Sequence, residues 1–489
     1  MIGTLTIRAD CSTTIGTGHV MRMIALGQAW KQLGGKVRIV GQITPLIDRL
    51  SNEHFELVNL DNTYPSPEDI EVLLEATSKN EWIAIDGYQF DSDYQKQILE
   101  AGRRTLVLDD VNDRGRYYAS ALLNQNPDGN HYDYKVNEDA IRLLGSRFAL
   151  LRHEFLSHPR KDSTTSSKPR NILVTLGGGD PTNMTGTVIE SITQIDSDDL
   201  HVKVVCGAAN PHLDKLKTTA SNLKCHCEFL TAVNDMPSLI NWADIAISAA
   251  GSTCWELCYF RVPTVAIQIA DNQKGIIREL NRIQAAICLS MDTKANDITK
   301  ALSSLLTNTD KRKLIEKACS TIVDGKGAHR VACALLNADI RLRPATVDDS
   351  RRLYNWRNHP AVRARSFQSD PIEYGSHEAW FKSKLADASC KIFIAESTNG
   401  TALGQIRFEG MPTEALISIS VAPDHNGRGI GTHITKLGCQ SIEAIYPGIP
   451  VTAFVMKDNP ASANMFRAAG FISAPNDADD SLKFEWKHS

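Results

Sequence analysis

The segment from Thr6 to Arg22 constrains the fold more than any other part of the chain. It starts as a short apolar strand, passes through a loop of Ser, Thr and Gly, and enters a stretch from Val20 to Leu33 whose apolar residues recur at helical spacing. Gly16 and Gly18 carry no side chain, so backbone N–H groups at the helix start can approach a phosphate or a sugar closely. The segment therefore predicts a strand, a ligand-binding loop and a helix.

His19 stands at the mouth of this loop. With an unperturbed pKa of about 6.5, an imidazole can take a proton from water near neutral pH. A glycine turn that happens to carry a surface histidine is the alternative for a pattern this short. The residues alone leave both interpretations open.

Short apolar strands alternate with helical stretches up to about residue 160, which predicts a parallel sheet flanked by helices. The clearest strand candidates are residues 36–40, 82–86, 104–109 and 120–124. Three polar runs end these strands, where open α/β sheets place their ligands. These runs are Asp86-Gly87-Tyr88, Asp109-Asp110 and Asn124-Gln125-Asn126. Turn formation and helix capping are the alternatives for such residues.

A second α/β half follows a polar segment without periodicity, residues 161–169, which we interpret as a linker. It opens with the strand 171–176 and a glycine-rich turn. Two later strands run into helices at residues 251–256 and 271–273. Such strand-to-helix turns suit a nucleotide diphosphate at a helix N-terminus and a ribose held by a carboxylate.

Size and charge narrow the class of protein. A chain of 489 residues is too long for one core, so we expect two or three domains. The net charge of -4 offers no broad attraction for nucleic acid or an anionic membrane. No apolar run approaches the roughly 20 residues that span a bilayer, and no signal peptide is recognised. We expect a cytoplasmic protein with no nucleic-acid partner and no membrane insertion.

The 11 cysteines are scattered and odd in number, which fits reduced thiols better than a disulfide framework. The run Cys225-His226-Cys227 suggests a metal site, but no second ligand pair follows at zinc-site spacing. We expect no metal.

The opening segment resembles the UDP-sugar hydrolases of pseudaminic acid synthesis, the family called PseG. The family pattern appears as Arg8-Ala9-Asp10 and Ile15-Gly16-Thr17-Gly18-His19-Val20-Met21-Arg22. Residues 143–155 resemble the same family. Its later motifs fall on Gly178-Gly179-Asp180-Pro181, Gly251-Ser252-Thr253-Cys254-Trp255-Glu256 and Asn272-Gln273.

This resemblance implies the double-Rossmann arrangement called GT-B, built like the transferase MurG, with UDP on the second half. It implies that His19 is the general base for a water attacking the anomeric carbon. Glu256 would bind the ribose, with a helix-terminus carboxylate as its alternative, and the turn Gly251 to Thr253 would bind the diphosphate. Asn272 and Gln273 would contact sugar or phosphate. The further substrate-binding candidates are Asp10, Gly16, Gly18, Arg22, Tyr88, Gly178, Gly179 and Ser252.

The pattern changes near Ile340. Residues up to about 385 are rich in Arg, Trp and His, and strands follow at 391–395, 402–408 and 415–421. Two opening helices followed by strands predict a mixed α+β domain. Within it, residues 419–432 form a strand, a basic glycine-rich loop and a helix, an arrangement that can wrap a pyrophosphate with backbone amides.

The loop resembles the acetyl-CoA motif of the GNAT N-acetyltransferases, which falls on Asn426-Gly427-Arg428-Gly429-Ile430-Gly431, and residues 459–471 match the family's ending. Asn426 replaces the usual Gln or Arg, and Phe466 stands where many members carry a Tyr as general acid. The resemblance implies acetyl-CoA as co-substrate. Its candidate contacts are Val421, Asn426, Gly427, Arg428, Gly429, Ile430, Gly431, Thr432, Asn459 and Asn464.

The pieces around Trp356-Arg357-Asn358, His377 and Gly404–Phe408 resemble the subgroup called PseH, which acetylates a 4-amino UDP-sugar. His377 and Glu409 are candidates for deprotonating the amine, with a structural role as the alternative for each.

The two resemblances together predict three domains: residues 1–162 and 163–337 as the halves of a hydrolase, and 338–489 as an acetyltransferase. In this pathway, which serves flagellin glycosylation, the two activities are consecutive. The acetyltransferase would acetylate UDP-4-amino-4,6-dideoxy-N-acetyl-β-L-altrosamine. The hydrolase would then split UDP-2,4-diacetamido-2,4,6-trideoxy-β-L-altropyranose into UDP and the free sugar. Expected partners are the UDP-linked amino sugar, acetyl-CoA and other enzymes of the pathway.

Two alternatives stay open. The first is a MurG-like GT-B glycosyltransferase that passes a UDP-sugar to an acceptor and carries an accessory acetyltransferase domain. The second is that one half has lost activity and binds nucleotide sugar as a scaffold or sensor.

Overall fold

The computed structural model describes residues 2–12, 15–79, 81–161, 168–177, 180, 182–207, 210–231, 233–397, 400–476 and 480–486. Internal contacts divide the chain into Met1–Ala332, called unit 1 below, and Cys333–Ser489, called unit 2. Three predicted features lie outside the described residues: the central part of the linker with the boundary at 162, the glycines Gly178 and Gly179, and Pro181.

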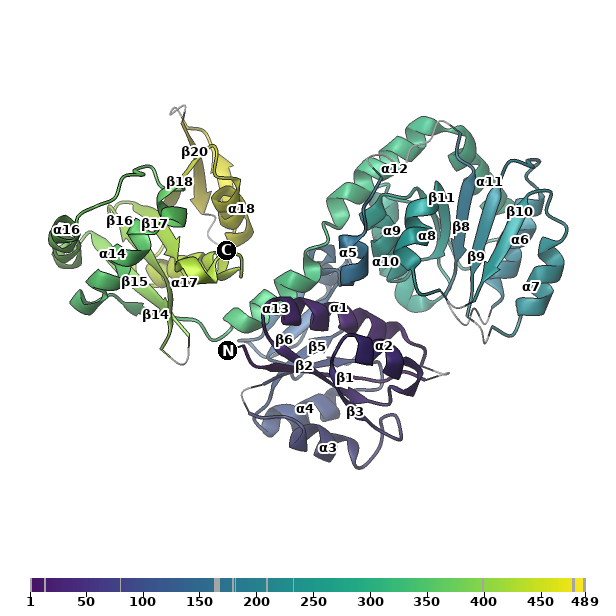
Figure 1. Ribbon diagram of the computed structural model, residues 1–489, viewed down its shortest axis with the longest axis horizontal. Helices are drawn as coiled ribbons and strands as arrows, with labels where there is room; N and C mark the ends of the chain where they lie inside the picture. The colour runs from purple at the N-terminus through teal and green to yellow at the C-terminus, as the bar shows by residue number, and fades with distance from the viewer. Residues whose placement is uncertain are drawn as a thin grey trace. The chain divides into compact units, whose positions relative to one another are not determined.

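The N-terminal half of unit 1 is built on a seven-stranded sheet in the order β3-β2-β1-β4-β5-β6-β7, in which all neighbours are parallel. Its strands are β1 (Thr4–Ala9), β2 (Lys36–Gly41), β3 (Glu56–Asn59), β4 (Trp82–Asp86), β5 (Arg104–Leu108), β6 (Ala121–Asn124) and β7 (Ile141–Leu144). Its helices are α1 (Gly18–Gln32), α2 (Ile47–Asn52), α3 (Asp69–Glu75), α4 (Ser92–Glu100) and α5 (His153–Ser157). Figure 1 shows α1 and α2 on one face of the sheet and α3 and α4 on the other.

The C-terminal half of unit 1 repeats this design with a six-stranded parallel sheet in the order β10-β9-β8-β11-β12-β13. Its strands are β8 (Asn171–Thr175), β9 (His201–Val205), β10 (His226–Leu230), β11 (Ile245–Ala249), β12 (Thr264–Ile267) and β13 (Ile287–Leu289). Its helices are α6 (Met184–Thr193), α7 (Leu213–Ala220), α8 (Met236–Trp242), α9 (Thr253–Phe260), α10 (Lys274–Arg282), α11 (Ala295–Thr307) and α12 (Thr309–Ile322). The last residues of unit 1 and the first of unit 2 belong to one helix, α13 (Gly327–Asn337).

The strands predicted at 36–40, 82–86, 104–109, 120–124 and 171–176 agree with the structure to within one residue at each end, whereas β1 begins at Thr4, two residues before the predicted Thr6. The reason is burial: β4, β5, β6 and β8 are buried along almost their whole length, and strands covered on both faces read as continuous apolar runs. The predicted helix after the first loop begins two residues earlier than its apolar periodicity, at Gly18. His19 is therefore part of the first helical turn.

Unit 2 is a mixed seven-stranded sheet in the order β14-β15-β16-β17-β18-β20-β19. Its strands are β14 (Arg341–Pro344), β15 (Cys390–Glu396), β16 (Ala402–Glu409), β17 (Ala415–Val421), β18 (Val451–Met456), β19 (Phe471–Ala474) and β20 (Ser481–Trp486). Its helices are α14 (Ser350–Asn358), α15 (Pro360–Arg363), α16 (Tyr374–Ala386), α17 (Ile430–Ile445) and α18 (Pro460–Ala469). The short α15 adds a third helix to the two predicted before β15.

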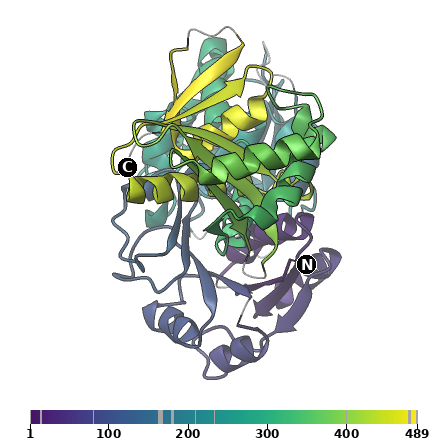
Figure 2. The ribbon, with the colours of Figure 1, turned by 90° about the vertical axis from the view of Figure 1, so that its left-hand side faces the viewer.

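The two faces of this sheet are covered by different helices. The larger core joins residues of α17 and α18, such as Ile434 and Phe466, to Ile406 and Phe408 of β16. A smaller core packs α14 and α16 against Ile392 and Ile394 of β15. Figure 2, in which this unit faces the viewer, shows the green helices lying across the sheet. The mixed α+β arrangement is the one that the sequence predicts.

Among the described helices, none is both long enough and apolar enough to cross a membrane.

Candidate active site

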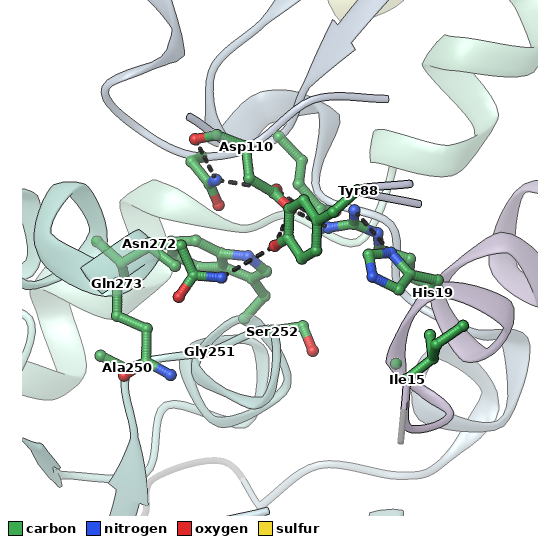
Figure 3. A pocket seen from close by; sticks show the side chains of 15 residues that line it. Ile15, His19, Tyr88, Asp110, Ala250, Gly251, Ser252, Asn272 and Gln273 are labelled. Atoms are coloured by element: carbon green, nitrogen blue, oxygen red, sulfur yellow. Dashed lines mark hydrogen bonds and ion pairs between the residues drawn. The ribbon is translucent and has the colours of Figure 1, made fainter. Parts of the chain in front are cut away.

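A polar pocket in unit 1 is lined by residues from both α/β halves (Figure 3). The N-terminal half contributes residues that follow β1, β4, β5 and β6, and the C-terminal half contributes residues that follow β11 and β12. The lining residues are Ile15, Gly18, His19, Arg22, Tyr88, Asp110, Gln125, Asn126, Ala250, Gly251, Ser252, Trp255, Asn272, Gln273 and Ile276. The pocket thus lies where the carboxyl ends of parallel strands meet, the usual ligand position in such sheets.

His19 is oriented in this pocket by a buried carboxylate. Its Nδ1 lies 2.8 Å from Oδ1 of Asp86, the last residue of β4, and the Asp86 side chain is 1% exposed. An ionised carboxylate can only accept a hydrogen bond, so Nδ1 carries the proton and Nε2 keeps its lone pair. A base held by a third group in this way is the arrangement that activates a water or a hydroxyl group.

Asp86 stays ionised because of its neighbours. Burial alone would raise the pKa of this carboxyl, but the charge of Arg22 and the contact with His19 hold the pKa well below its usual range. Arg22 Nε and Nη2 each lie 2.6 Å from an Asp86 oxygen, and Arg22 Nη1 lies 3.0 Å from both oxygens of Asp110. Arg22 therefore lines the pocket, but its N–H groups donate hydrogen bonds to the carboxylates of Asp86 and Asp110.

Tyr88 connects the two halves of unit 1. Its hydroxyl donates to Asp110 Oδ2 at 3.0 Å and accepts from Asn272 Nδ2 at 2.9 Å, as the dashed lines in Figure 3 mark. The His19 and Tyr88 rings meet edge to face with their centroids 5.0 Å apart. Burial and the charge of Asp110 raise the pKa of the Tyr88 phenol, so it remains a hydrogen-bond donor at neutral pH.

The C-terminal wall of the pocket is the start of α9. Gly251 and Ser252 line the pocket, and no side chain caps the helix that follows them. The first N–H groups of a helix lack intrahelical partners and carry partial positive charge, which suits an anion such as a diphosphate. Gln273 is fixed beside them, since its Oε1 accepts from the backbone N–H of Ile269 at 2.8 Å.

Four of the candidates drawn from the sequence do not line the pocket: Asp10, Gly16, Thr253 and Glu256. Asp10 is fully buried and accepts from Arg8 Nη1 at 2.6 Å and from Gln89 Nε2 at 3.0 Å. Its carboxylate also accepts from the backbone N–H of Gln42 at 2.8 Å, so Asp10 joins the end of β1 to the residues that follow β2 and β4. Gly16 takes a left-handed conformation with φ of 77°, as the turn requires.

Glu256 is paired with the N-terminal half instead. Its Oε1 lies 3.4 Å from Arg152 Nη2, and its side chain is 14% exposed. Burial raises the pKa of Glu256 to about 7, with a further contribution from Glu154, while Arg152 acts in the opposite direction. A carboxyl that is half-protonated near neutral pH makes this contact dependent on pH.

We expect Glu256→Gln to remove a pH-dependent part of the stability of unit 1. The folded-state pKa lies above the ordinary value of 4.5, so the folded protein holds this proton more tightly, and the associated stability is full below pH 4.5 and lost as pH rises through 7. A rise in the pKa from 4.5 to about 7 corresponds to an upper limit of about 3 kcal/mol. Urea unfolding at pH 5 and pH 8 measures this effect. The free energy of unfolding of Glu256→Gln relative to that of wild type should be higher at pH 8 than at pH 5. The exposed Glu190→Gln should show no such change with pH. Equal pH slopes for wild type and Glu256→Gln would contradict the prediction.

Several residues that line the pocket were not predicted from the sequence. Asp110, Gln125 and Asn126 belonged to runs at strand ends, but nothing singled them out from their neighbours. Ile15, Trp255 and Ile276 gave no signal beyond proximity to motif residues, because apolar lining residues look like core residues in a sequence.

Unit 2 carries a second candidate site at the glycine-rich loop before α17. Gly427 and Gly429 have φ of 79° and 67°, the left-handed region, and α17 begins at Ile430 without a side-chain cap and without an acidic residue in its first turn. Its first N–H groups are therefore open to a phosphate. Asn426 donates to the carbonyl of Pro423 at 3.2 Å, so this side chain is engaged within the loop.

The strands beside this loop separate. β17 pairs with β18 only at Ala415↔Val451 and Leu416↔Thr452, and the rest of β17 faces no partner on that side among the described residues. Ser420 Oγ in the unpaired part is buried without a hydrogen-bond partner. The amide-containing arm of coenzyme A offers donors and acceptors to such an edge, and its pyrophosphate suits the loop. The chemistry of these residues thus fits acetyl-CoA.

Other candidates in unit 2 have structural contacts. His377 is 5% exposed, and its Nε2 lies 3.0 Å from the carbonyl oxygen of Ser350, so it ties α16 to α14. Asn459 caps α18 by accepting from the N–H of Ser462 at 3.1 Å. Asn464 is exposed, and Phe466 packs in the core. Glu409 lies between Lys384 Nζ at 2.5 Å and Arg407 Nε at 2.8 Å.

The part of the chain that the structure describes contains no group of three or more His, Cys, Asp or Glu side chains arranged to hold a metal ion.

Two parallel Rossmann-like halves with a pocket between them define unit 1 as GT-B-like, and the mixed sheet with its loop at α17 defines unit 2 as an acetyltransferase domain of GNAT type. Residues 171–328 match the glycosyltransferase family 28 C-terminal domain, and residues 339–472 match the acetyltransferase (GNAT) domain. The crystal structure of Acinetobacter baumannii MurG superimposes with a TM-score of 0.51 at 14% identity, over 68% of this chain and 99% of that one. The predicted fold class is confirmed.

Relatives span one or both units. An uncharacterized protein of Methanocaldococcus jannaschii is 22% identical over 96% of both chains. The spore coat polysaccharide biosynthesis protein SpsG of Bacillus subtilis is 25% identical over 67% of this chain and 96% of its own. The pseudaminic acid cytidylyltransferase and UDP-2,4-diacetamido-2,4,6-trideoxy-beta-L-altropyranose hydrolase of Helicobacter pylori is 22% identical over 60% of this chain and 49% of its own. The resemblance to PseG-type hydrolases, followed by a GNAT domain, is confirmed.

Proposed function

We propose that the protein is a bifunctional nucleotide-sugar enzyme that N-acetylates a UDP-linked 4-amino sugar and then hydrolyses the acetylated product to UDP and the free sugar. The observation that carries the hydrolase assignment is His19, held by Asp86 at 2.8 Å in a pocket whose opposite wall is the uncapped start of α9. A base and an anion site face one pocket. That combination suits the attack of water on a carbon that carries a diphosphate leaving group.

In the proposed hydrolytic step, His19 Nε2 takes a proton from water while the water oxygen bonds to the anomeric carbon. The bond between that carbon and the diphosphate oxygen breaks, and its electron pair leaves with UDP. N–H groups at Gly251, Ser252 and the start of α9 stabilise the charge on the leaving diphosphate. Asp86 stabilises the imidazolium that forms. Glu256 would bind the ribose once nucleotide displaces Arg152, and Asn272 and Gln273 would bind sugar or phosphate.

In the proposed acetyl transfer, the neutral amine of the sugar attacks the thioester carbon of acetyl-CoA. The carbon–sulfur bond breaks, coenzyme A leaves as a thiolate, and the proton lost by the nitrogen ends on that thiolate. The loop from Asn426 to Gly431 would hold the pyrophosphate with its backbone N–H groups, and β17 would hold the arm that carries the thioester. The acceptor would be UDP-4-amino-4,6-dideoxy-N-acetyl-β-L-altrosamine, as for the PseH-like enzymes that the N-terminal part of this domain resembles. Residues 1–337 would supply the hydrolase and 338–489 the acetyltransferase, acting in the cytoplasm.

The relatives support this assignment at two levels. The Helicobacter pylori relative, whose name includes the hydrolase activity, aligns over a share of this chain close to the length of unit 1. The Methanocaldococcus jannaschii relative aligns over nearly the whole chain, which supports one polypeptide with both units.

A GT-B glycosyltransferase is the second candidate function. The match of residues 171–328 to a glycosyltransferase C-terminal domain favours it. In that case the attacking group at the anomeric carbon would be an acceptor hydroxyl, and His19 would deprotonate that hydroxyl.

A mass-spectrometric time course separates these functions. Purified protein is incubated with acetyl-CoA and the UDP-4-amino sugar, and UDP, the acetylated UDP-sugar and the free diacetamido sugar are followed. We expect the acetylated UDP-sugar to appear first and then UDP with the free sugar. Acetylation without release of UDP would overturn the hydrolase assignment and favour the glycosyltransferase.

Gly429→Ala is expected to weaken acetyl-CoA binding and leave hydrolysis unchanged. The residue has φ of 67°, and a Cβ there would lie 3.2 Å from Cβ of Cys333, so an alanine must strain the loop or shift it. An alanine in the free protein relaxes out of the left-handed conformation, and restoring that conformation when acetyl-CoA binds costs about 1 kcal/mol, equivalent to roughly a fivefold rise in the dissociation constant. Calorimetric titration with acetyl-CoA measures the change, and UDP release from pre-acetylated substrate is the control. Unchanged affinity would remove the loop from the acetyl-CoA site.

A further inference from the structure

Two side-chain amides form part of the N-terminal wall of the pocket. Gln125 and Asn126 directly follow β6, line the pocket and are only 3% and 4% exposed. Side chains this buried keep little accessible surface. What they do expose belongs to the pocket that they line.

The orientation of the Gln125 amide is fixed by the backbone. Its Oε1 accepts from the N–H of Leu150 at 2.9 Å, and a backbone N–H can only donate, so oxygen and nitrogen cannot be exchanged. Nε2 has no hydrogen-bond partner among the described residues, and it is not one of the buried unpartnered polar atoms. It is therefore a donor with access to the open space of the pocket.

The Asn126 amide is fixed in the opposite sense. Its Nδ2 donates to Asp110 Oδ1 at 3.1 Å and to the Asp110 backbone carbonyl at 3.4 Å, and a carbonyl oxygen can only accept. The carbonyl oxygen Oδ1 is left without a partner among the described residues and is not sealed from the pocket. The wall thus presents one donor and one acceptor from two consecutive residues, each held by a contact that fixes its chemical identity.

A secondary amide is the group that complements this pair. Its carbonyl accepts from Gln125 Nε2, and its N–H donates to Asn126 Oδ1. Ile15 and Ile276 also line the pocket and offer apolar surface for a methyl group. An ammonium group has no lone pair for the Gln125 donor, so it would leave that donor unpaired in a largely buried wall. A buried donor left unpaired lowers the binding free energy by more than the net contribution of one hydrogen bond.

We propose that Gln125 and Asn126 recognise the acetamido group on C4 of the sugar, so that unit 1 hydrolyses the acetylated UDP-sugar and rejects the free amine. This inference rests on the proposed function. C4 lies across the pyranose ring from the anomeric carbon. With the diphosphate at the start of α9 in the C-terminal half, the C4 substituent projects toward the wall formed by the N-terminal half. Acetyl transfer therefore has to precede hydrolysis.

The test compares two substrates without acetyl-CoA: the UDP-sugar with an acetamido group at C4 and its 4-amino precursor. We expect wild type to release UDP from the acetylated sugar with kcat/KM at least 100-fold higher. Gln125→Glu keeps one oxygen for Leu150 N–H but turns the donor into a carboxylate acceptor that suits an ammonium. It should lower this ratio at least tenfold. Gln32→Glu, which adds the same charge at the exposed end of α1, should leave the ratio unchanged.

A substrate analogue tests the same contact with the native protein. Replacing the amide hydrogen at C4 by a methyl group removes the donor for Asn126 Oδ1, and we expect kcat/KM to fall at least tenfold. Equal hydrolysis of the amino and acetamido sugars, an unchanged ratio in a folded Gln125→Glu, or full activity on the N-methyl analogue would each overturn the inference and leave the hydrolase function standing. If neither sugar releases UDP, the proposed function itself fails.

Discussion

His19→Ala is expected to stop UDP release while acetyl transfer continues. The variant lacks the imidazole whose Nε2 would take the proton of the attacking water, and general base catalysis contributes about 10²–10⁴-fold to a reaction. We therefore expect the rate of UDP release to fall roughly 10³-fold. With acetyl-CoA and the 4-amino sugar, the acetylated UDP-sugar should accumulate, and a mass-spectrometric time course follows both species.

Asp86→Asn serves as the companion variant. The asparagine keeps the shape of the side chain but no longer obliges Nδ1 to carry the proton, so a fraction of His19 adopts the wrong tautomer. UDP release should lie between that of wild type and that of His19→Ala. Release of UDP at the wild-type rate by His19→Ala would show that His19 has no part in the mechanism. Loss of acetylation in the same variant would point to misfolding, which circular dichroism detects.

Gly275→Ala is expected to lower both stability and hydrolysis through the contact between the two halves of unit 1. A Cβ at this position in the first turn of α10 would lie 1.9 Å from Oδ2 of Asp128, a residue of the N-terminal half. Asp128 cannot simply turn away, because its side chain is buried and Oδ2 is 3.1 Å from Arg278 Nη2 and 3.3 Å from the Tyr132 hydroxyl.

The helix must therefore shift, and with it the turn that carries Asn272 and Gln273 into the pocket. Overpacking of this kind costs about 1–3 kcal/mol. A displacement of about 1 Å at a reacting site costs on the order of 100-fold in rate. We expect both effects, measured by urea unfolding and by kcat/KM for UDP release.

Two controls decide whether the Gly275 contact is the cause. Asp128→Ala in the Gly275→Ala background opens space for the new methyl group, so the double variant should be more stable than the sum of the single effects predicts. Gly375→Ala in α16 is the matched substitution, because a Cβ there meets nothing within 4 Å. Wild-type hydrolysis in Gly275→Ala would show that the halves tolerate displacement at this contact.

The N-terminal wall of the pocket could be predicted from the sequence, because the carboxyl ends of parallel strands meet at one edge of a sheet. The strand-end runs contain Tyr88, Asp110 and the pair after β6, which line the pocket, and Asp86, which orients His19. Spacing alone does not choose between Asp109 and Asp110, since neighbouring residues diverge in direction. Asp109 is buried under the hydroxyl groups of Tyr117 and Tyr134, which lie 2.7 Å and 2.6 Å from its oxygens, whereas Asp110 lines the pocket.

Long-range ion pairs account for what the sequence does not reveal. Arg8 and Asp10 appear as a family pattern, yet their burial depends on Asp69, which is 61 residues from Arg8 and bonds to its guanidinium. The sequence predicts Glu256 as a ribose ligand. Its contact with Arg152 of the other half is seen only in the folded structure. Motif spacing reports neighbours along one chain segment, while these partners arrive from separate elements.

One helix, α13, serves both units. At its start, a Cβ on Gly327 would lie 2.1 Å from the carbonyl oxygen of Ala149, so this end is fitted closely to the backbone of unit 1. At its end, Asn337 Nδ2 donates to the carbonyl oxygen of Arg428 in the glycine-rich loop of unit 2. A gene divided anywhere in this stretch would deprive one product of helical turns that it uses. Two separately encoded enzymes would each need their own copy of the helix, whereas the fused chain uses one helix for both units.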